Sequence, residues 1–482
     1  MTNTPEYTPI AVIPNIHSTL RATFRSGVTK PISWRRQQLL QLARLLQDNV
    51  ELFAEALRLD LGRPKQEVYL IEVGASIQRC LLNAENLSEW TKEHEVEVAD
   101  YQKRWKARYH HSPKGVVLII VPWNYPVILS IQPLSSAIAA GCCALMKPSE
   151  LSPHFSTLFA ELLPKYLDPA AYSVVQGAIP ETTKVLELKW DHICYTGNGR
   201  VARIIAAAAA KHLTPLTLEL GGKSPAIIDP ATNIDLAAKR IMWGKVINSG
   251  QTCVAADYVL TVSSAVPALV EAIKRQISAF FPQGALDPAS TYGRLISEAH
   301  AERLKSLLNR TKGTVVIGGR SEGADGTGKH AMEPTVVIDV KDGDSLLEEE
   351  LFGPILPIIS VESISEAIEF INSRDHPLAL YVFTDNEEIK QEVINKTTAG
   401  GVTFNDTFQQ LSITALPFGG VGESGYGRQS MIHGFEDFSY TKGVVDIPKD
   451  AEPFFARRYP PYTAESLEFY TTIAVKVPIP AE

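Results

Sequence analysis

Residues 192–225 read HICYTGNGRVARIIAAAAAKHLTPLTLELGGKSP, and this stretch carries the strongest indication of the fold class. It contains an apolar segment, a glycine turn, an alanine-rich helical segment and a second apolar segment, in that order. A strand, a helix and a further strand joined by short connections are typical of a parallel α/β sheet. Between the first strand and the helix, Gly197-x-Gly199-x-x-Ala202 has the lettering of a dinucleotide-binding turn.

Glu219 ends the second predicted strand, and its surroundings allow three roles. An acid after such a turn can bind a ribose hydroxyl of a dinucleotide. An acid on an apolar strand, followed by two glycines, can instead serve as a general base. The third reading is a paired structural carboxylate. A similar lettering at Gly420–Gly425 does not follow a central strand, and we predict an ordinary loop there.

The same alternation of strands and helices extends over most of the chain and predicts an α/β fold. The predicted strands are Gly115–Val121, Ala144–Met146, Tyr172–Val175, His192–Tyr195, Leu216–Leu220, Ala226–Asp229, Tyr258–Val262, Thr314–Ile317, Thr335–Val340 and Ile355–Val361. The predicted helices are Trp34–Leu61, Glu67–Lys92, Gln132–Gly141, Phe155–Tyr166, Val201–Lys211, Asp235–Asn248 and Pro267–Phe280. We further expect a strand or hairpin at Glu95–Tyr109, a surface loop at Gly318–Gly328 and a β-like segment at Ser466–Pro478.

Length and charge restrict the class of protein. The chain has 482 residues, which suggests two to four domains, and its net charge of −8 argues against a nucleic-acid partner. Five cysteines are an odd and small number for this length, which indicates free thiols in a reducing compartment. No signal peptide is recognisable at the start of the sequence. We therefore expect a cytoplasmic protein.

The run from Gly115 to Met146 has no charged residue and is long enough to span a bilayer. Pro122, Asn124 and Pro126 interrupt it, and lipid does not tolerate such a break in the backbone. We predict a buried strand, a turn and a buried helix here, and no integral membrane segment.

Cys253 stands out among the cysteines because a polar turn, Asn248–Thr252, precedes it. A backbone N–H in such a turn can face a developing oxyanion. A cysteine nucleophile also needs a lowered pKa or a nearby base, and no histidine is adjacent in the sequence. The base must therefore come from elsewhere in the fold.

Several short blocks occur together in one order: PWNYP (122–126), KPSE (147–150), TGN (196–198), LELGGKSP (218–225), GQTC (250–253), EELFGP (349–354), FND (404–406) and PFGGVG (417–422). In this order they resemble the aldehyde dehydrogenase superfamily, most closely its class 3 branch of fatty and aromatic aldehyde enzymes. The resemblance implies a Rossmann-like cofactor domain, a second α/β catalytic domain and a small β oligomerisation element. The implied ranges are 1–100 with 116–219, then 220–416, and then 101–115 with 417–482.

The resemblance also implies roles for individual residues. Cys253 is similar to the nucleophile, Asn124 to the amide donor of the oxyanion hole, and Glu219 to the general base. The positions that match the NAD(P) site are Pro122, Trp123, Lys147, Ser149, Glu150, Gly177, Gly197, Asn198, Leu220, Glu350 and Phe352. The candidate residues of an apolar substrate tunnel are Tyr125, Ile128, Phe404 and Phe408. No metal is expected.

The implied activity is NAD(P)-dependent oxidation of an aldehyde to its acid, through a thiohemiacetal and a thioester on Cys253. Medium or long aliphatic or aromatic aldehydes fit an apolar tunnel. NAD is slightly favoured over NADP because Glu150 would repel a 2′-phosphate, although Arg200 and Ala202 depart from the usual turn. The alternatives are a CoA-acylating relative and a cofactor-independent thiol esterase. The resemblance further implies a homodimer formed by strand exchange.

Overall fold

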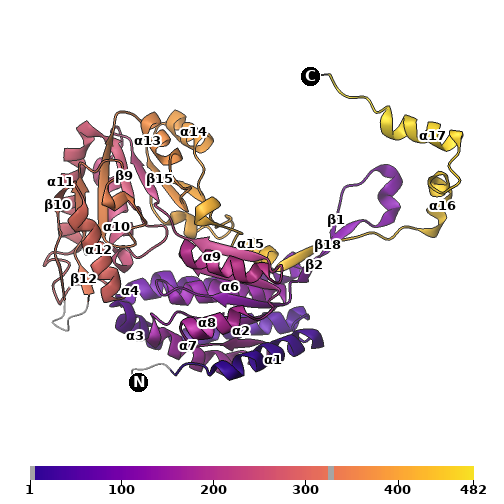
Figure 1. The fold of residues 1–482 in the computed structure, drawn as a ribbon, viewed down its shortest axis with the longest axis horizontal. Helices are drawn as coiled ribbons and strands as arrows, with labels where there is room; N and C mark the ends of the chain where they lie inside the picture. The colour runs from indigo at the N-terminus through magenta and orange to yellow at the C-terminus, as the bar shows by residue number, and fades with distance from the viewer. Residues whose placement is uncertain (1–5, 324–329, 482) are drawn as a thin grey trace. The chain divides into compact units, whose positions relative to one another are not determined.

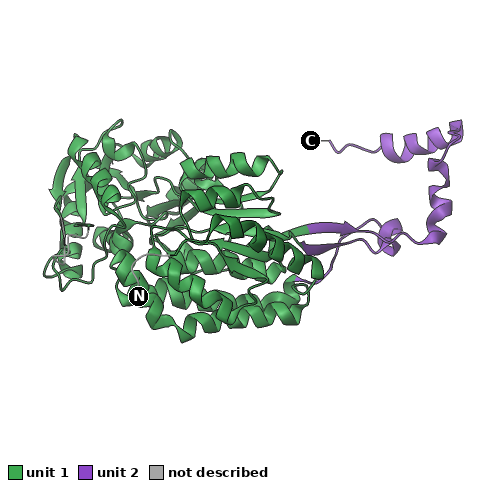
Figure 2. Cartoon of the chain, turned by 60° about the horizontal axis from the view of Figure 1, so that its bottom comes forward, with its two compact units in different colours: residues 1–90, 113–440 green, residues 91–112, 441–482 purple. Residues whose placement is uncertain are grey.

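The computed structural model describes residues 6–323 and 330–481. The chain separates into two compact units, residues 1–90 with 113–440 and residues 91–112 with 441–482 (Figure 2). The first unit contains two mixed, mostly parallel sheets whose strands alternate with helices along the chain (Figure 1). The predicted α/β fold is therefore confirmed.

The first sheet contains the strand–turn–helix–strand segment of residues 192–225. Its strand order is β17-β7-β6-β3-β4-β5, and β17 alone runs antiparallel to its neighbour. All residues of β3 and β4 are buried, which explains the uncharged run between them, because parallel strands are covered on both faces. The strands are β3 (Val116–Ile120), β4 (Cys143–Lys147), β5 (Tyr172–Val174), β6 (His192–Gly197), β7 (Leu216–Leu220) and β17 (Gly425–Tyr426).

One helix beside this sheet, α6, is longer than the sequence predicted. It begins at Pro126 rather than at Gln132, and it contains Pro133. Pro126 lies in the first turn, where no N–H donor is needed, and Glu72 accepts the N–H of Ile128 at 2.9 Å. The helices of this part are α1 (Ile13–Ser26), α2 (Ile32–Asp48), α3 (Val50–Leu61), α4 (Lys65–Glu67), the π-helix η2 (Val68–Gly74), α5 (Ala75–Trp90), α6 (Pro126–Ala140), α7 (Pro153–Tyr166), α8 (Ile179–Leu186), α9 (Gly199–Ala210) and α15 (Met431–Asp437).

The second sheet has the order β10-β13-β14-β9-β8-β15-β16, and only β10 is antiparallel to its neighbour. Its strands are β8 (Pro225–Ile228), β9 (Tyr258–Val262), β10 (Thr314–Ile317), β13 (Thr335–Ile338), β14 (Ile355–Val361), β15 (Ala379–Phe383) and β16 (Gly401–Phe404). Its helices are α10 (Ile234–Val246), α11 (Val266–Phe280), α12 (Glu298–Arg310), α13 (Ile364–Asn372) and α14 (Glu387–Lys396). Sequence reasoning did not identify β15 and β16.

The predicted loop Gly318–Gly328 is wrong in part. Ser321–Gly323 (β11) pairs antiparallel with His330–Met332 (β12), so part of this glycine-rich segment is a strand. The remainder, residues 324–329, lies outside the described residues.

The second unit contains a small sheet and the C-terminal segment. His94–Glu95 (β1) pairs with Arg108–Pro113 (β2), and Ser439–Val444 (β18) completes the sheet. The predicted strand or hairpin at Glu95–Tyr109 is confirmed in part, because Asp100–Trp105 between the two strands forms a 3-10 helix. The predicted β-like segment Ser466–Pro478 is wrong, because α17 (Ala464–Tyr470) and a π-helical turn (Thr471–Val475) occupy most of it. Two hydrogen bonds exchanged between Thr463 and Ser466 cap the start of α17.

A short helix, α16 (Glu452–Phe455), precedes α17 in this unit. Within residues 6–323 and 330–481, no helix has the length and apolar character needed to cross a membrane.

Candidate active site

One cleft of about 1320 Å³ contains the three predicted catalytic residues, Cys253, Glu219 and Asn124. The carboxyl ends of β3, β6 and β7 contribute to its lining, as expected for a ligand site on a parallel sheet. The predicted cofactor residues that also line it are Pro122, Trp123, Lys147, Ser149, Glu150, Gly197, Asn198, Leu220, Glu350 and Phe352. Gly177 does not line the cleft, whereas the next residue, Ala178, does.

A rigid turn after α10 carries Cys253. Asn248 and Ser249 both have left-handed backbone angles, with φ of 49° and 53°. At Gly250, which has a φ of 73°, an added Cβ would lie 2.3 Å from the carbonyl oxygen of Gly353. The Gln251 amide donates to the carbonyls of Asn248 and Arg294, both at 2.9 Å. Backbone strain of this kind persists only where neighbouring contacts hold it, and such strain is frequent at functional sites.

Cys253 is the only one of the five cysteines that is not fully buried. Its thiol nevertheless lies in a poorly hydrated position, which raises its pKa to about 12. Burial is the largest cause, and the carboxylates of Glu350 and Glu219 add to the shift. The thiol is therefore protonated at neutral pH, and a proton acceptor is needed before the sulfur can attack.

Asn124 lies in the connection between β3 and α6 and is only 3% exposed. Its side-chain Nδ2 donates to the carbonyl oxygen of Gln251 at 3.1 Å, two residues before the cysteine. Because an amide nitrogen carries two hydrogens, one donor remains for a ligand in the cleft. The contact joins the Asn124 turn to the cysteine turn.

Glu219 lies near the end of β7, where Gly425 of β17 pairs with it. Neither carboxyl oxygen has a hydrogen-bond partner within the described part of the protein, although the side chain is buried. Burial raises the pKa of Glu219 well above its usual value, and the negative charge of Asp437 raises it further. A buried, unpartnered carboxyl group with a raised pKa is typical of a general base or acid. The second glycine motif, Gly420–Gly425, leads into β17, the strand that pairs with β7 beside Glu219.

The cleft fits the phosphates and adenosine ribose of a dinucleotide. Helix α9 begins beside it at Gly199, and the side chain of Asn198 caps this helix by accepting the N–H of Val201 at 3.0 Å. A helix N-terminus presents free N–H groups and a partial positive charge to an anion. Nearby, the Lys147 ammonium and the Glu150 carboxylate lie 3.8 Å apart and offer a donor and an acceptor to ribose hydroxyls. Arg200 lines the cleft and is exposed, whereas Ala202 is buried.

A second group of predicted cofactor residues consists of Trp123, Glu350 and Phe352, of which Glu350 lies against the Gly221–Gly222 turn. An added Cβ on Gly221 would lie 2.1 Å from a carboxyl oxygen of Glu350, so only glycine permits this approach. Burial raises the pKa of Glu350 to about 8. The rings of Trp123 and Phe352 meet edge to face, with 5.4 Å between their centroids.

The predicted tunnel residues do not form one group. Phe408 packs in the same apolar cluster as Cys253. The hydroxyl groups of Tyr125 and Thr252 form a hydrogen bond of 2.9 Å. Phe404 packs in a different cluster, and Ile128 is half-buried at the start of α6. None of the four lines the cleft that contains Cys253.

Comparison with known proteins agrees with this geometry. Residues 13–444, most of the chain, match the Aldehyde dehydrogenase family. The chain belongs to this family. The enzyme is therefore an oxidoreductase that acts on aldehydes and uses NAD(P). Among the residues that the structure describes, no group of three or more His, Cys, Asp or Glu side chains could hold a metal ion.

Individual relatives place the enzyme in the predicted class 3 branch. It is 41% identical to the dimeric, NADP-preferring aldehyde dehydrogenase of Rattus norvegicus over 92% of this chain and 97% of that one. It is 42% identical to aldehyde dehydrogenase family 3 member A2 of Mus musculus over 92% of this chain and 90% of that one. A substrate-bound Staphylococcus aureus aldehyde dehydrogenase has a TM-score of 0.91 at 37% identity, covering 95% of this chain and 99% of that one.

Sequence reasoning missed several residues at the site. His300 and Arg303 line the cleft, and His300 packs against Trp123 with 5.1 Å between the ring centroids. Arg63 and Glu72 form a buried ion pair beside Asn124. No local motif marks these positions, because they reach the site only through tertiary packing.

Proposed function

We propose that this enzyme oxidises a medium- or long-chain aliphatic or aromatic aldehyde to the carboxylic acid. Cys253 acts as the nucleophile, Asn124 as an oxyanion donor and Glu219 as the general base. One observation carries the proposal: a cysteine, an amide donor and a buried carboxyl group without a partner line a single cleft.

The first step joins the Cys253 sulfur to the aldehyde carbon. The thiol proton passes to Glu350, whose charge affects the pKa of Cys253 more than that of Glu219 does, so Glu219 remains free for the last step. The aldehyde oxygen then becomes the oxyanion of a thiohemiacetal. The side-chain N–H of Asn124 and the backbone N–H of Cys253 stabilise it, and one such donor contributes roughly 3–4 kcal/mol in comparable sites.

The last step frees the cysteine. Glu219 takes a proton from water while the water oxygen attacks the thioester carbon, the C–S bond breaks, and the acid leaves. The free carboxyl oxygens of Glu219 suit this role better than that of a ribose ligand, because no residue that the structure describes forms a hydrogen bond with them.

The cofactor residues divide between two ends of the cleft. Lys147, Glu150 and the N-terminus of α9 would hold the adenosine ribose and the pyrophosphate. Glu350 and Phe352 would orient the nicotinamide end. When bound, the nicotinamide supplies the hydride acceptor.

Since relatives are named dimeric, we also propose a homodimer.

Replacing Glu150 with glutamine is expected to raise the kcat/KM ratio for NADP over NAD by about tenfold, or ~1.4 kcal/mol. The carboxylate repels a 2′-phosphate, and the amide does not. Initial rates with both cofactors at several concentrations measure this ratio. Glu161→Gln, on the exposed face of α7, is the matched control. An unchanged ratio in Glu150→Gln would remove Glu150 from the adenosine site.

A series of straight-chain aldehydes tests the substrate class. Each buried methylene contributes about 0.8 kcal/mol, so kcat/KM should rise about fourfold for each added carbon that the enzyme removes from water. A flat series would reject the proposed preference for medium- and long-chain aldehydes. The product, identified by mass spectrometry with CoA present, should be the free acid. Acyl-CoA would support the CoA-acylating alternative, and ester cleavage without aldehyde-dependent NADH would support a thiol esterase.

A further inference from the structure

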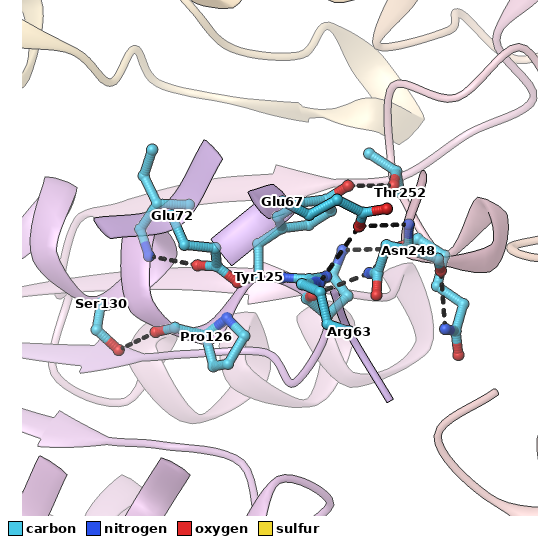
Figure 3. Close-up of polar contacts among 11 residues, drawn as sticks. Arg63, Glu67, Glu72, Tyr125, Pro126, Ser130, Asn248 and Thr252 are labelled. Carbon is cyan, nitrogen blue, oxygen red and sulfur yellow. Dashed lines mark hydrogen bonds and ion pairs between the residues drawn. The ribbon is translucent and has the colours of Figure 1, made fainter. Parts of the chain in front are cut away.

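A fully buried ion pair, Arg63 with Glu72, lies next to the turn that carries Asn124. Arg63 follows α3, and Glu72 lies in the π-helical segment η2; both side chains have no exposed surface. The Arg63 guanidinium donates to the Glu72 carboxylate (Figure 3). Burying two charges is costly, so a buried ion pair is weak evidence of stability. Single π-helical turns are also frequent at functional sites.

Arg63 contacts the backbone of the oxyanion donor itself. Its second terminal nitrogen donates to the carbonyl oxygen of Asn124. The Asn248 side chain donates to the same oxygen at 2.9 Å. The guanidinium also lies 4.3 Å from the centre of the Tyr125 ring. Arg63 and the cysteine-turn residue Asn248 thus hold the backbone of residue 124 through one shared carbonyl oxygen.

Glu72 contacts the segment that follows Asn124 in the sequence. Its second carboxyl oxygen accepts the N–H of Ile128 at 2.9 Å, in the first turn of α6. Because α6 begins at Pro126, Glu72 fixes the helix that follows Asn124, while Arg63 fixes the residue. Glu67 completes the cluster by accepting the backbone N–H of Asn248 at 3.1 Å (Figure 3).

We propose that Arg63 and Glu72 are positioning residues that hold the Asn124 amide at the oxyanion site. Neither side chain lines the cleft, so they act through Asn124 and not on substrate or cofactor. This inference rests on the oxyanion role proposed for Asn124. A displacement of about 1 Å in a reacting group can cost about 100-fold in rate, so a supporting pair has a measurable effect on the chemistry.

The test is a double-mutant cycle between Glu72→Gln and Asn124→Ala. The readout is the cofactor-free acylation of Cys253 by p-nitrophenyl acetate, measured as the pre-steady-state release of p-nitrophenol. Glu72→Gln keeps the shape of the side chain and removes its charge. In the otherwise native enzyme it should slow acylation by about 10–100-fold. In the Asn124→Ala background it should change the rate by less than about twofold, because the group it positions is gone.

Asp60→Asn is the matched control. Asp60, near the end of α3, is also a buried carboxylate that binds the start of a helix: it accepts the N–H groups of His154 and Phe155 in α7 at 3.1 and 2.9 Å. Among the described residues, no hydrogen bond or ion pair joins it to the Asn124 turn. Its replacement should lower the melting temperature by an amount similar to that in Glu72→Gln, without slowing acylation. If Glu72→Gln does not fold, Arg63→Lys replaces it, because lysine keeps the charge but cannot contact Glu72 and Asn124 together.

The outcomes separate the two levels of inference. If Glu72→Gln slows acylation equally in both backgrounds, or not at all, the positioning role is wrong. If Asn124→Ala itself leaves acylation unchanged, the oxyanion role of Asn124 is wrong. A slower reaction with Asn124→Ala and an unchanged one with Glu72→Gln rejects the positioning role alone.

Discussion

Cys253→Ala is expected to lower aldehyde-dependent NADH formation by at least about 10⁴-fold, by analogy with loss of other covalent nucleophiles. The sulfur is the atom that forms the thiohemiacetal, and alanine has no group that can replace it. Binding of NAD should persist within about twofold, because the residues proposed to bind the cofactor are unchanged. Fluorescence titration of the cofactor and a continuous NADH assay measure the two quantities separately.

The control for this substitution is Cys80→Ala, which removes a thiol buried in the core on α5. It should cost some stability and leave the turnover number nearly unchanged. Substantial turnover in Cys253→Ala would reject Cys253 as the nucleophile. Loss of cofactor binding in the same variant would show that the residue shapes the cleft rather than reacting in it.

Glu219→Gln is expected to slow release of the acid by about 10²–10⁴-fold, the usual contribution of a general base. Glutamine keeps the size of the side chain and cannot accept a proton from water. Acylation should proceed, so NADH should appear as a burst of about one equivalent per site followed by a slow phase. Mass spectrometry of the intact protein should then detect the acyl group on Cys253.

The pH dependence of deacylation gives a second measurement. Burial raises the pKa of Glu219, so at low pH the carboxyl group is protonated and cannot act as a base. The rate of acid release should therefore rise as the pH increases through this raised pKa. Glu219→Gln should lose that part of the profile. A profile that stays the same in the variant would assign the titration to another group.

Glu423→Gln is the matched control, because Glu423 also lines the cleft but pairs with Arg203. It should leave deacylation unchanged. If Glu219→Gln altered only the preference between NAD and NADP, with no acyl-enzyme, the ribose-ligand reading of Glu219 would be restored.

Most strands of both sheets were predictable from the sequence, because buried parallel strands are short, apolar and separated by turns or helices. Two neighbouring strands of the second sheet, β15 and β16, were not recognised. All four residues of β16 are half-buried, and this intermediate pattern does not distinguish a strand from a loop. The C-terminal segment was assigned wrongly because Thr, Ile and Val favour strands, while its helix depends on the cap at Thr463.

The order of short motifs was enough to predict the family, the reaction class and the residues Cys253, Asn124 and Glu219 as candidates. Each of these residues lies in a short contiguous motif, so it can be recognised from the sequence. The distances between them in the cleft and their burial could not be predicted from the sequence. The proposal that Glu219 is a base rather than a ribose ligand rests on the absence of hydrogen-bond partners for its oxygens among the described residues, which is a property of the surroundings.

The sequence by itself determined the parallel α/β fold and the chemistry available to it, because backbone periodicity and reactive side chains are local properties. Only the tertiary structure showed that Arg63 contacts Asn124 and Glu72 contacts the helix after it, and that burial raises the pKa of both Cys253 and Glu219. Burial and long-range contacts depend on how distant segments pack. Pairing and solvent exclusion therefore appear only when the chain is folded.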